Sequence, residues 1–149
     1  NITRDSVMQC INALDYDYYF RMTDLLLEHK VPESMVLFND IVGKGFDGGV
    51  FIGGMASHMR NLLMSRDQAT MPLLDTADSM RQRYAEQAAK CSVKFLYHSI
   101  RICDRCSNEY KSSYNKRLSV EITLIEAAQF SDDDAGAGRS PVKILKTIL

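Results

Sequence analysis

The chain has 149 residues and a formal charge of −1, because 18 Lys and Arg face 19 Asp and Glu. This length favours a single domain, and the balanced charge argues against a protein that holds nucleic acid through bulk positive charge. With 46% hydrophobic and 25% charged residues the composition is that of a globular domain, and no apolar run is long enough to span a membrane. No signal peptide is expected, and the first residue, Asn, suggests a fragment of a longer protein.

Apolar residues recur at helical spacing along most of the chain, whereas no stretch alternates apolar and polar residues over six positions. We therefore expect an all-α bundle of about five to seven helices. The predicted helices, in chain order, span 3–13, 15–29, 32–42, 47–65, a segment opened by Pro72 and Asp75 that continues to Ala88, 92–110 and 115–130. Asp47 and Ser92 are the predicted N-caps of the fourth and sixth helices, and the seventh helix begins at Asn115.

Each predicted helix carries an apolar stripe that should face the core. In the fourth helix the inward residues are Phe51, Met55, Met59, Leu62 and Leu63. In the sixth helix they are Val93, Leu96, Tyr97, Ile100, Cys103, Ser107 and Tyr110.

The end of the chain has a different composition. Residues 131–140 are small, polar and acidic, which is typical of a linker. Pro141 to Leu149 could form a short amphipathic piece that cannot bury much surface alone, so we expect it to be poorly ordered or to pack on a neighbour.

The seventh predicted helix has an apolar arc of roughly 220° at 100° per residue, which is wider than a surface helix needs. Lys116, Ser119, Thr123 and Glu126 fill the remaining polar face. Arg117 and Glu121 project from within the apolar arc and can pair, because they are four residues apart. Two roles stay open for them: an internal salt bridge that ties two helices, or a contact with another subunit.

The cysteines do not form a recognisable metal motif. Only Cys103 and Cys106 have C-x-x-C spacing, and a structural zinc site needs a second pair or histidines at matching spacing. His29, His58 and His98 stand on different predicted helices. We therefore predict reduced cysteines in a helix and no metal, while a cysteine nucleophile with a histidine base stays as a less favoured alternative.

Two glycine-rich stretches do not predict a nucleotide site. Residues 43–48 match G-x-G-x-x-G, but a dinucleotide site requires a preceding strand, and the preceding segment has helical spacing. Gly49 to Gly54 has the glycine spacing of a phosphate loop, but Met55 follows where that loop would need Lys. Gly53 and Gly54 lie inside the fourth helix, where they cost roughly 2 kcal/mol of helix propensity. The pair would be explained by the close approach of another helix, or by a fold that simply tolerates two glycines there.

A basic run near the start of the last helix has two possible readings. Lys111, Lys116 and Arg117, with Tyr110 and Tyr114 between them, are compatible with nucleic-acid contact. A solvated junction between helices is the favoured interpretation.

Three stretches together resemble a known family. They are L-D-Y-D-Y-Y-F at 14–20; G-F-D at 45–47 with Phe51 and S-H-M-R-N-L-L at 57–63; and N-K-R-L-S-V-E-I-T-L-I at 115–125. In this order they are similar to the region that follows the ATPase module in the gamma/tau subunit of bacterial DNA polymerase III, most like the Bacteroides group. The resemblance covers about residues 10–130, and R-x-x-V-E-x-T-L-I is its most specific element.

The resemblance implies an all-helical collar domain that holds the subunits of the clamp loader in a five-membered ring. It implies that 1–14 is the end of the preceding lid domain, 15–130 the collar and 131–149 a linker with a possible short helix. The implied partners are the delta and delta prime subunits and further gamma/tau copies. DNA would be contacted only indirectly, the protein would be cytoplasmic, and ATPase activity would belong to other domains of a DNA polymerase holoenzyme, so no cofactor is expected here.

Alternatives from other classes stay open: a helical adaptor that binds a single peptide and, less favoured, the cysteine-dependent enzyme. Under the collar interpretation, self-association of the chain into a homo-oligomer also stays open. We predict no catalytic residue. The candidate residues for a subunit interface or for locking the bundle are Arg117, Glu121, Leu124, Ala128, Gly53, Gly54 and Arg60.

Overall fold

The computed structural model describes residues 16–74 and 76–131, and within them it is all-helical, with no strand. This confirms the predicted all-α bundle. The elements are a helix over 16–27, α2 (Val31–Gly43), α3 (Gly48–Ser65), the short 3-10 turn η1 (Met71–Leu73), α4 (Asp78–Ala88), α5 (Val93–Glu109), the 3-10 turn η2 (Tyr110–Ser112) and α6 (Lys116–Ala128).

The helices begin where the sequence places their caps. At both predicted N-caps, Asp47 and Ser92, the side-chain oxygen accepts a hydrogen bond of 3.0 Å from the backbone N–H three residues ahead. Asn115, the predicted start of the last helix, caps α6 in the same way, also at 3.0 Å. Pro32 lies in the first turn of α2. Gly45 has a φ of 97° between α2 and α3, so the glycine-rich stretch forms a helix–helix turn.

The predicted start of the fifth helix is wrong. Pro72 belongs to the separate 3-10 turn η1, and the backbone becomes extended at Leu74 before α4 begins at Asp78. Proline fixes φ for a first turn in either kind of helix, so it cannot by itself distinguish a short 3-10 turn from a longer α-helix. Asp75 lies outside the described residues.

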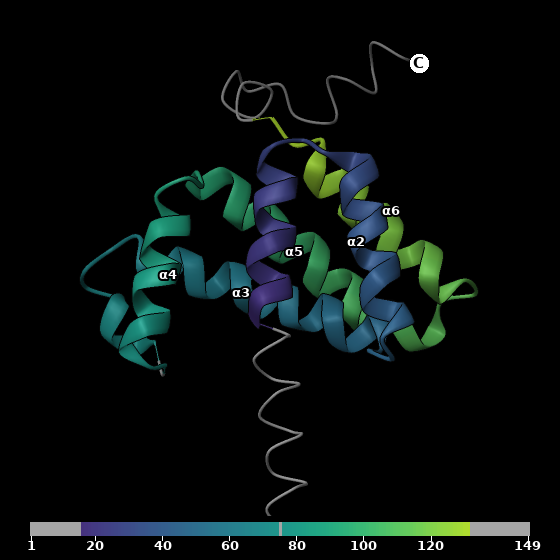
Figure 1. Cartoon of the computed structure of the whole chain (residues 1–149), viewed down its shortest axis with the longest axis horizontal. Coiled ribbons are helices and arrows are strands. Elements are labelled where there is room, and N and C mark those ends of the chain that lie inside the picture. Colours follow the sequence, from purple (N-terminus) through teal and green to yellow (C-terminus); the bar gives the residue numbers. More distant parts are fainter. Residues whose placement is uncertain (1–15, 75, 132–149) are drawn as a thin grey trace, which may run out of the picture.

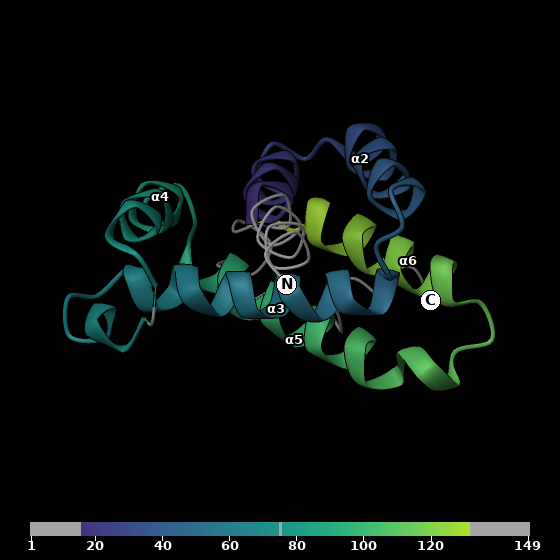
Figure 2. The same ribbon diagram turned by 60° about the horizontal axis from the view of Figure 1, so that its bottom comes forward.

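Helix α3 is central to the bundle. It packs most extensively along α5 and also contacts α4 and α6, while α6 packs on α2 as well. Helix 16–27 crosses α3 through ring contacts, among them Phe20 against His58 with centroids 4.6 Å apart. In Figure 2, helix 16–27 and α2 lie on one side of α3, and α5 runs along its opposite side.

The core lies between these layers. The largest fully buried apolar side chains are Met22, Leu26, Phe38, Ile41, Ile52, Met55, Met59, Leu62, Leu96, Val120 and Leu124. The predicted inward face of the fourth helix is therefore largely confirmed, with Leu63 only partly buried. In Figure 1, α4 stands at one end of the bundle and α2 with α6 at the other.

The predicted buried stripe of α5 is partly wrong. Leu96 and Cys103 are fully buried, but Val93 and Tyr97 are half-exposed or more, and Tyr110 belongs to η2. The buried face instead follows Phe95, Leu96, Ser99, Ile102, Cys103 and Cys106. The two stripes share Leu96 and Cys103, so periodicity alone could not decide towards which side the buried face extends. The packing of α3 and α6 on α5 decides it.

The predicted helix over 3–13, the lid boundary at 14 and the C-terminal piece from Pro141 lie outside the described residues, as does the linker apart from Ser131. The division into domains therefore stays a prediction. No helix of the described residues is long and apolar enough to cross a membrane.

Candidate subunit interface

Helix α6 has two different apolar faces. On the inner face Val120, Leu124, Ala127 and Ala128 are buried, together with Thr123, whose hydroxyl donates to the Ser119 carbonyl at 3.0 Å. The sequence placed Thr123 on the polar face, which is wrong. A threonine that satisfies its hydroxyl on its own helix can be buried at little cost, and residue type does not show this.

On the outer face Leu118 and Ile122 are exposed by 47% and 51%. They are four residues apart and therefore adjacent on the helix, and Ile125, one turn further, is partly buried. Just before the helix, the Tyr114 side chain is fully exposed. We call Leu118, Ile122 and Ile125 the outer stripe. The wide apolar arc thus combines a core face with a face that the described chain leaves about half exposed at Leu118 and Ile122.

Arg117 and Glu121 form the predicted pair, and they lie between the two faces of this arc. The Arg117 Nε donates to a Glu121 carboxylate oxygen at 3.2 Å. The same guanidinium donates to Asn39 Oδ1 on α2 at 2.7 Å and lies 5.9 Å from the centre of the Phe38 ring. The contacts of Arg117 therefore connect α6 with α2.

The Arg117–Glu121 pair is only partly buried, unlike an ion pair in a protein core. Side-chain exposure is 50% for Arg117 and 27% for Glu121, so the deep burial that would make loss of one partner cost about 3 kcal/mol is absent. A partly solvated pair of this kind contributes roughly 0.5 kcal/mol. Its geometry fits a link within the bundle, at the rim of the outer stripe.

The remaining candidates differ in accessibility. Leu124 and Ala128 are fully buried in the core, so they contribute to the bundle and not to an exposed surface. A Cβ on Gly54 would stand 1.9 Å from the Tyr19 hydroxyl oxygen, and one on Gly53 would stand 3.2 Å from the Ser107 hydroxyl oxygen. Gly54 therefore permits the close approach of helix 16–27 to α3. Arg60 is exposed on α3.

Sequence reasoning missed two features. The outer stripe was visible only as an arc that was too wide, because periodicity does not show which part of an arc the neighbours cover. Asn39, the acceptor for Arg117, carried no signal, since the pairing joins positions 78 residues apart.

A buried polar network surrounds His58 in the interior. His58 Nε2 is 2.7 Å from Gln87 Oε1, and the Gln87 amide donates to the Phe20 carbonyl and to Asp24. Because the Gln87 oxygen accepts, we assign the His58 proton to Nε2. Burial lowers the pKa of His58 to about 4. The imidazole is therefore neutral and joins α3, α4 and helix 16–27.

Cys91 and Cys103 are poorly suited to nucleophilic chemistry. Cys91 and Cys103 are buried, and burial raises the pKa of each thiol to about 12. Since the thiolate is the reactive form, both are protonated at neutral pH. No group of three or more His, Cys, Asp and Glu in the described part of the chain could hold a metal ion. The absence of a metal site in the whole chain stays a prediction.

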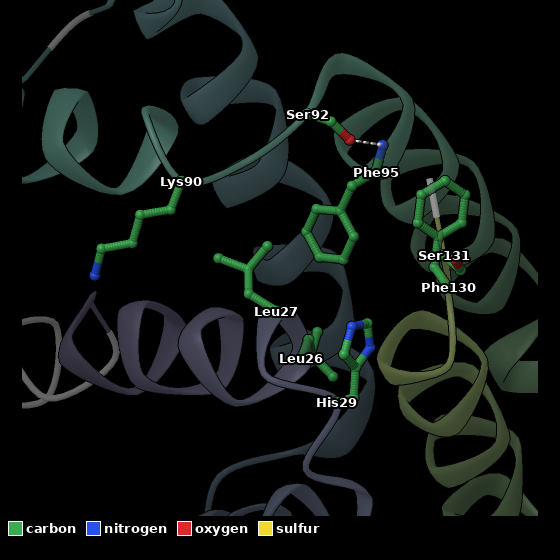
Figure 3. Close-up of a pocket in the computed structure, with 8 residues that line it drawn as sticks. All are labelled: Leu26, Leu27, His29, Lys90, Ser92, Phe95, Phe130 and Ser131. Atoms are coloured by element: carbon green, nitrogen blue, oxygen red, sulfur yellow. Dashed lines mark hydrogen bonds between the residues drawn. The ribbon is translucent and has the colours of Figure 1, made fainter. Parts of the chain in front are cut away.

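One cavity, of about 280 Å³, lies where the described chain ends (Figure 3). Its apolar lining comes from Leu26, Leu27, Phe95 and Phe130, and Lys90 points away from these side chains. The His29 Nδ1 bonds to the Ala128 carbonyl oxygen at 2.8 Å. This histidine holds the end of α6 against helix 16–27, and the Ser92 hydroxyl oxygen in the lining accepts a hydrogen bond from the Phe95 backbone N–H as the cap of α5.

Comparison with known proteins supplies the family. No curated protein matches the chain, so the likeness to the Bacteroides group stays a prediction. A sequence model of one family, described as DNA polymerase III subunits gamma and tau domain III, matches residues 2–135. That domain is helical and non-catalytic, which agrees with the bundle and the protonated thiols described above. The chain therefore belongs to the family of domain III of the gamma and tau subunits of DNA polymerase III.

Proposed function

We propose that this domain is the oligomerisation collar of a clamp loader and that the outer stripe of α6 is one of its subunit contacts. Its partners would be the delta and delta prime subunits and further gamma/tau copies, assembled in the cytoplasm to load sliding clamps during replication. Family membership supports the assembly role. The single observation that supports the surface is the exposure of Leu118 and Ile122 on a helix whose opposite face is core.

The physical basis is burial of apolar area. A fully buried Leu or Ile side chain contributes about 1.5–3 kcal/mol relative to an exposed one, and about half of each side chain is still available to bury. Arg117 and Glu121 lie beside the stripe and are already held by each other and by Asn39. A partner would therefore meet an apolar centre with an ordered polar rim, as in many protein interfaces.

The assembly role is tested by sedimentation velocity with purified delta and delta prime subunits. The 149-residue chain should form a complex that contains those subunits and sediments faster than any component alone. Separate boundaries for all components at tens of micromolar concentration would contradict the proposal.

One observation favours the adaptor alternative. A groove of about 470 Å³ lies between helix 16–27 and α2, lined by Leu25, Pro32 and Val36 among others, with Val36 exposed by 69%. An adaptor would keep the chain monomeric and bind a single peptide there. In that case Val36→Glu would abolish binding, whereas a collar that uses α6 should still assemble.

A further inference from the structure

The exposed cations of the domain are unevenly neutralised. Around helix 16–27, α2 and α4 most Lys and Arg side chains have carboxylate partners, as in Arg21–Asp17, Lys44–Asp40 and Lys90–Asp24. A second set is exposed and has no described carboxylate oxygen within 4.0 Å: Lys94, Arg101, Arg105, Lys111 and Lys116. We call these five residues the basic track.

Three residues of the track share one face of α5, and the other two lie in the segment that follows it. At 100° per residue Lys94, Arg101 and Arg105 fall within about 40° of one another on α5, directly opposite the fully buried Cys103. Their Cα atoms are spaced by about 10 Å and about 6 Å along the helix. Lys111 follows in η2 and Lys116 opens α6. In Figure 2, α5 runs along the border of the bundle away from helix 16–27 and α2 and then turns back into α6.

Two exposed aromatic rings accompany the cations. Tyr97 is 60% exposed, with the Arg101 guanidinium 5.9 Å from the centre of its ring. Tyr114 is fully exposed between Lys111 and Lys116. Aromatic rings set among cations are what a single strand requires, because its phosphates need positive charge and its unpaired bases need stacking surfaces. Arg101 and Arg105 line one groove together with Asp104, Glu109 and Glu126. These carboxylates lower the local positive charge, so binding should be weak.

We propose that the basic track binds the phosphate backbone of single-stranded nucleic acid, with Tyr97 and Tyr114 as stacking surfaces. This goes beyond the proposed function, which assigns only subunit contacts to the domain. The formal charge of −1 does not oppose it, because the distribution of charge decides whether one face attracts phosphate. A chain with a net charge near zero can still have one surface on which the cations lack carboxylate partners.

The test is fluorescence anisotropy of a labelled 20-nucleotide oligothymidylate titrated with the 149-residue chain at 50 mM salt. We expect a dissociation constant in the range of about 1–100 µM. The logarithm of the affinity should fall against the logarithm of the salt concentration with a slope of up to about −3.5, if all five cations neutralise a phosphate.

Arg101→Glu should weaken binding at least tenfold, and Tyr97→Ala should weaken it several-fold. The matched control is Arg60→Glu, since Arg60 is also exposed and unpaired among the described residues but lies on α3. This control should change affinity less than twofold, and circular dichroism should show that each variant is folded.

Three results would overturn the proposal. The first is no binding at 50 mM salt, and the second is an equal loss of affinity in Arg60→Glu and Arg101→Glu. The third is that poly-glutamate displaces the labelled oligonucleotide as well as unlabelled strand does when the two are compared at equal charge concentration. The last result would identify an acidic protein as the better partner. None of these results would count against the assembly role, because the sedimentation experiment with the partner subunits is done without nucleic acid.

Discussion

Replacement of Gly54 by Ala tests the packing of helix 16–27 on α3. Its new Cβ would stand 1.9 Å from the Tyr19 hydroxyl oxygen and 2.3 Å from the ring carbon that bears it. Tyr19 cannot swing away freely, because its ring stacks on Phe51 with centroids 5.6 Å apart and lies 6.0 Å from His58. Overpacking of this kind costs about 1–3 kcal/mol, against a gain of up to about 1 kcal/mol in helix propensity.

Gly53→Ala is the matched control. It is the neighbouring residue in the same helix and gains the same propensity, but its Cβ would stand 3.2 Å from the Ser107 hydroxyl oxygen, which can rotate away. Gly54→Ala should therefore be less stable than Gly53→Ala by about 1–3 kcal/mol. For a domain of this size each kcal/mol corresponds to about 3 °C in melting temperature.

Urea unfolding followed by circular dichroism measures the difference. Tyr19→Leu removes the hydroxyl and the ring, so it should restore part of the stability lost in Gly54→Ala, as a double-mutant cycle would show. If Gly53→Ala and Gly54→Ala have equal stability, or if Tyr19→Leu is simply additive with Gly54→Ala, the close approach of Tyr19 does not explain the glycine.

The other predictions concern titration, the ion pair and the thiols. Because the His58 pKa falls from 6.5 to about 4 on folding, the unfolded chain binds a proton more readily than the folded one as pH drops through 6.5. The free energy of unfolding should therefore fall by about 2 kcal/mol between pH 7 and pH 5. Urea titrations at both pH values should show that a His58→Gln variant lacks this part of the pH dependence. Glu121→Ala should cost less than about 1 kcal/mol in thermal melting, since the pair is partly solvated; a loss of 3 kcal/mol would refute that placement. Iodoacetamide should modify Cys91 and Cys103 at pH 8 only as fast as the domain unfolds, and rapid labelling seen by mass spectrometry would revive the cysteine-nucleophile reading.

Local signals predicted much of the fold. The caps at Asp47 and Ser92 and the helix start at Asn115 could be predicted because an N-cap acts within three residues of its own backbone. The spacing of Met55, Met59 and Leu62 was readable because α3 is buried along its length. By contrast, η1 could not be separated from α4, since the fixed φ of Pro72 suits either element.

The candidate surface was harder to predict, because it depends on what neighbouring helices cover. The arc of α6 contained Leu118 and Leu124 alike, yet α2, α3 and α5 bury only Leu124. The acceptor for Arg117 is Asn39, far away in sequence, so no spacing rule could identify it. The family resemblance indicated an assembly role, but it could not distinguish core positions from exposed ones on the same helix.

The most direct test of the assembly surface is to place charge on the outer stripe and measure association. The double variant Leu118→Glu/Ile122→Glu changes two exposed positions of α6, and Val36→Glu/Val50→Glu changes two exposed apolar positions elsewhere on the bundle. Sedimentation velocity with the delta and delta prime subunits should show that the α6 variant remains folded but fails to join the complex, whereas the control assembles normally. Normal assembly of the α6 variant would contradict the account, because the outer stripe would then contribute nothing to subunit contact.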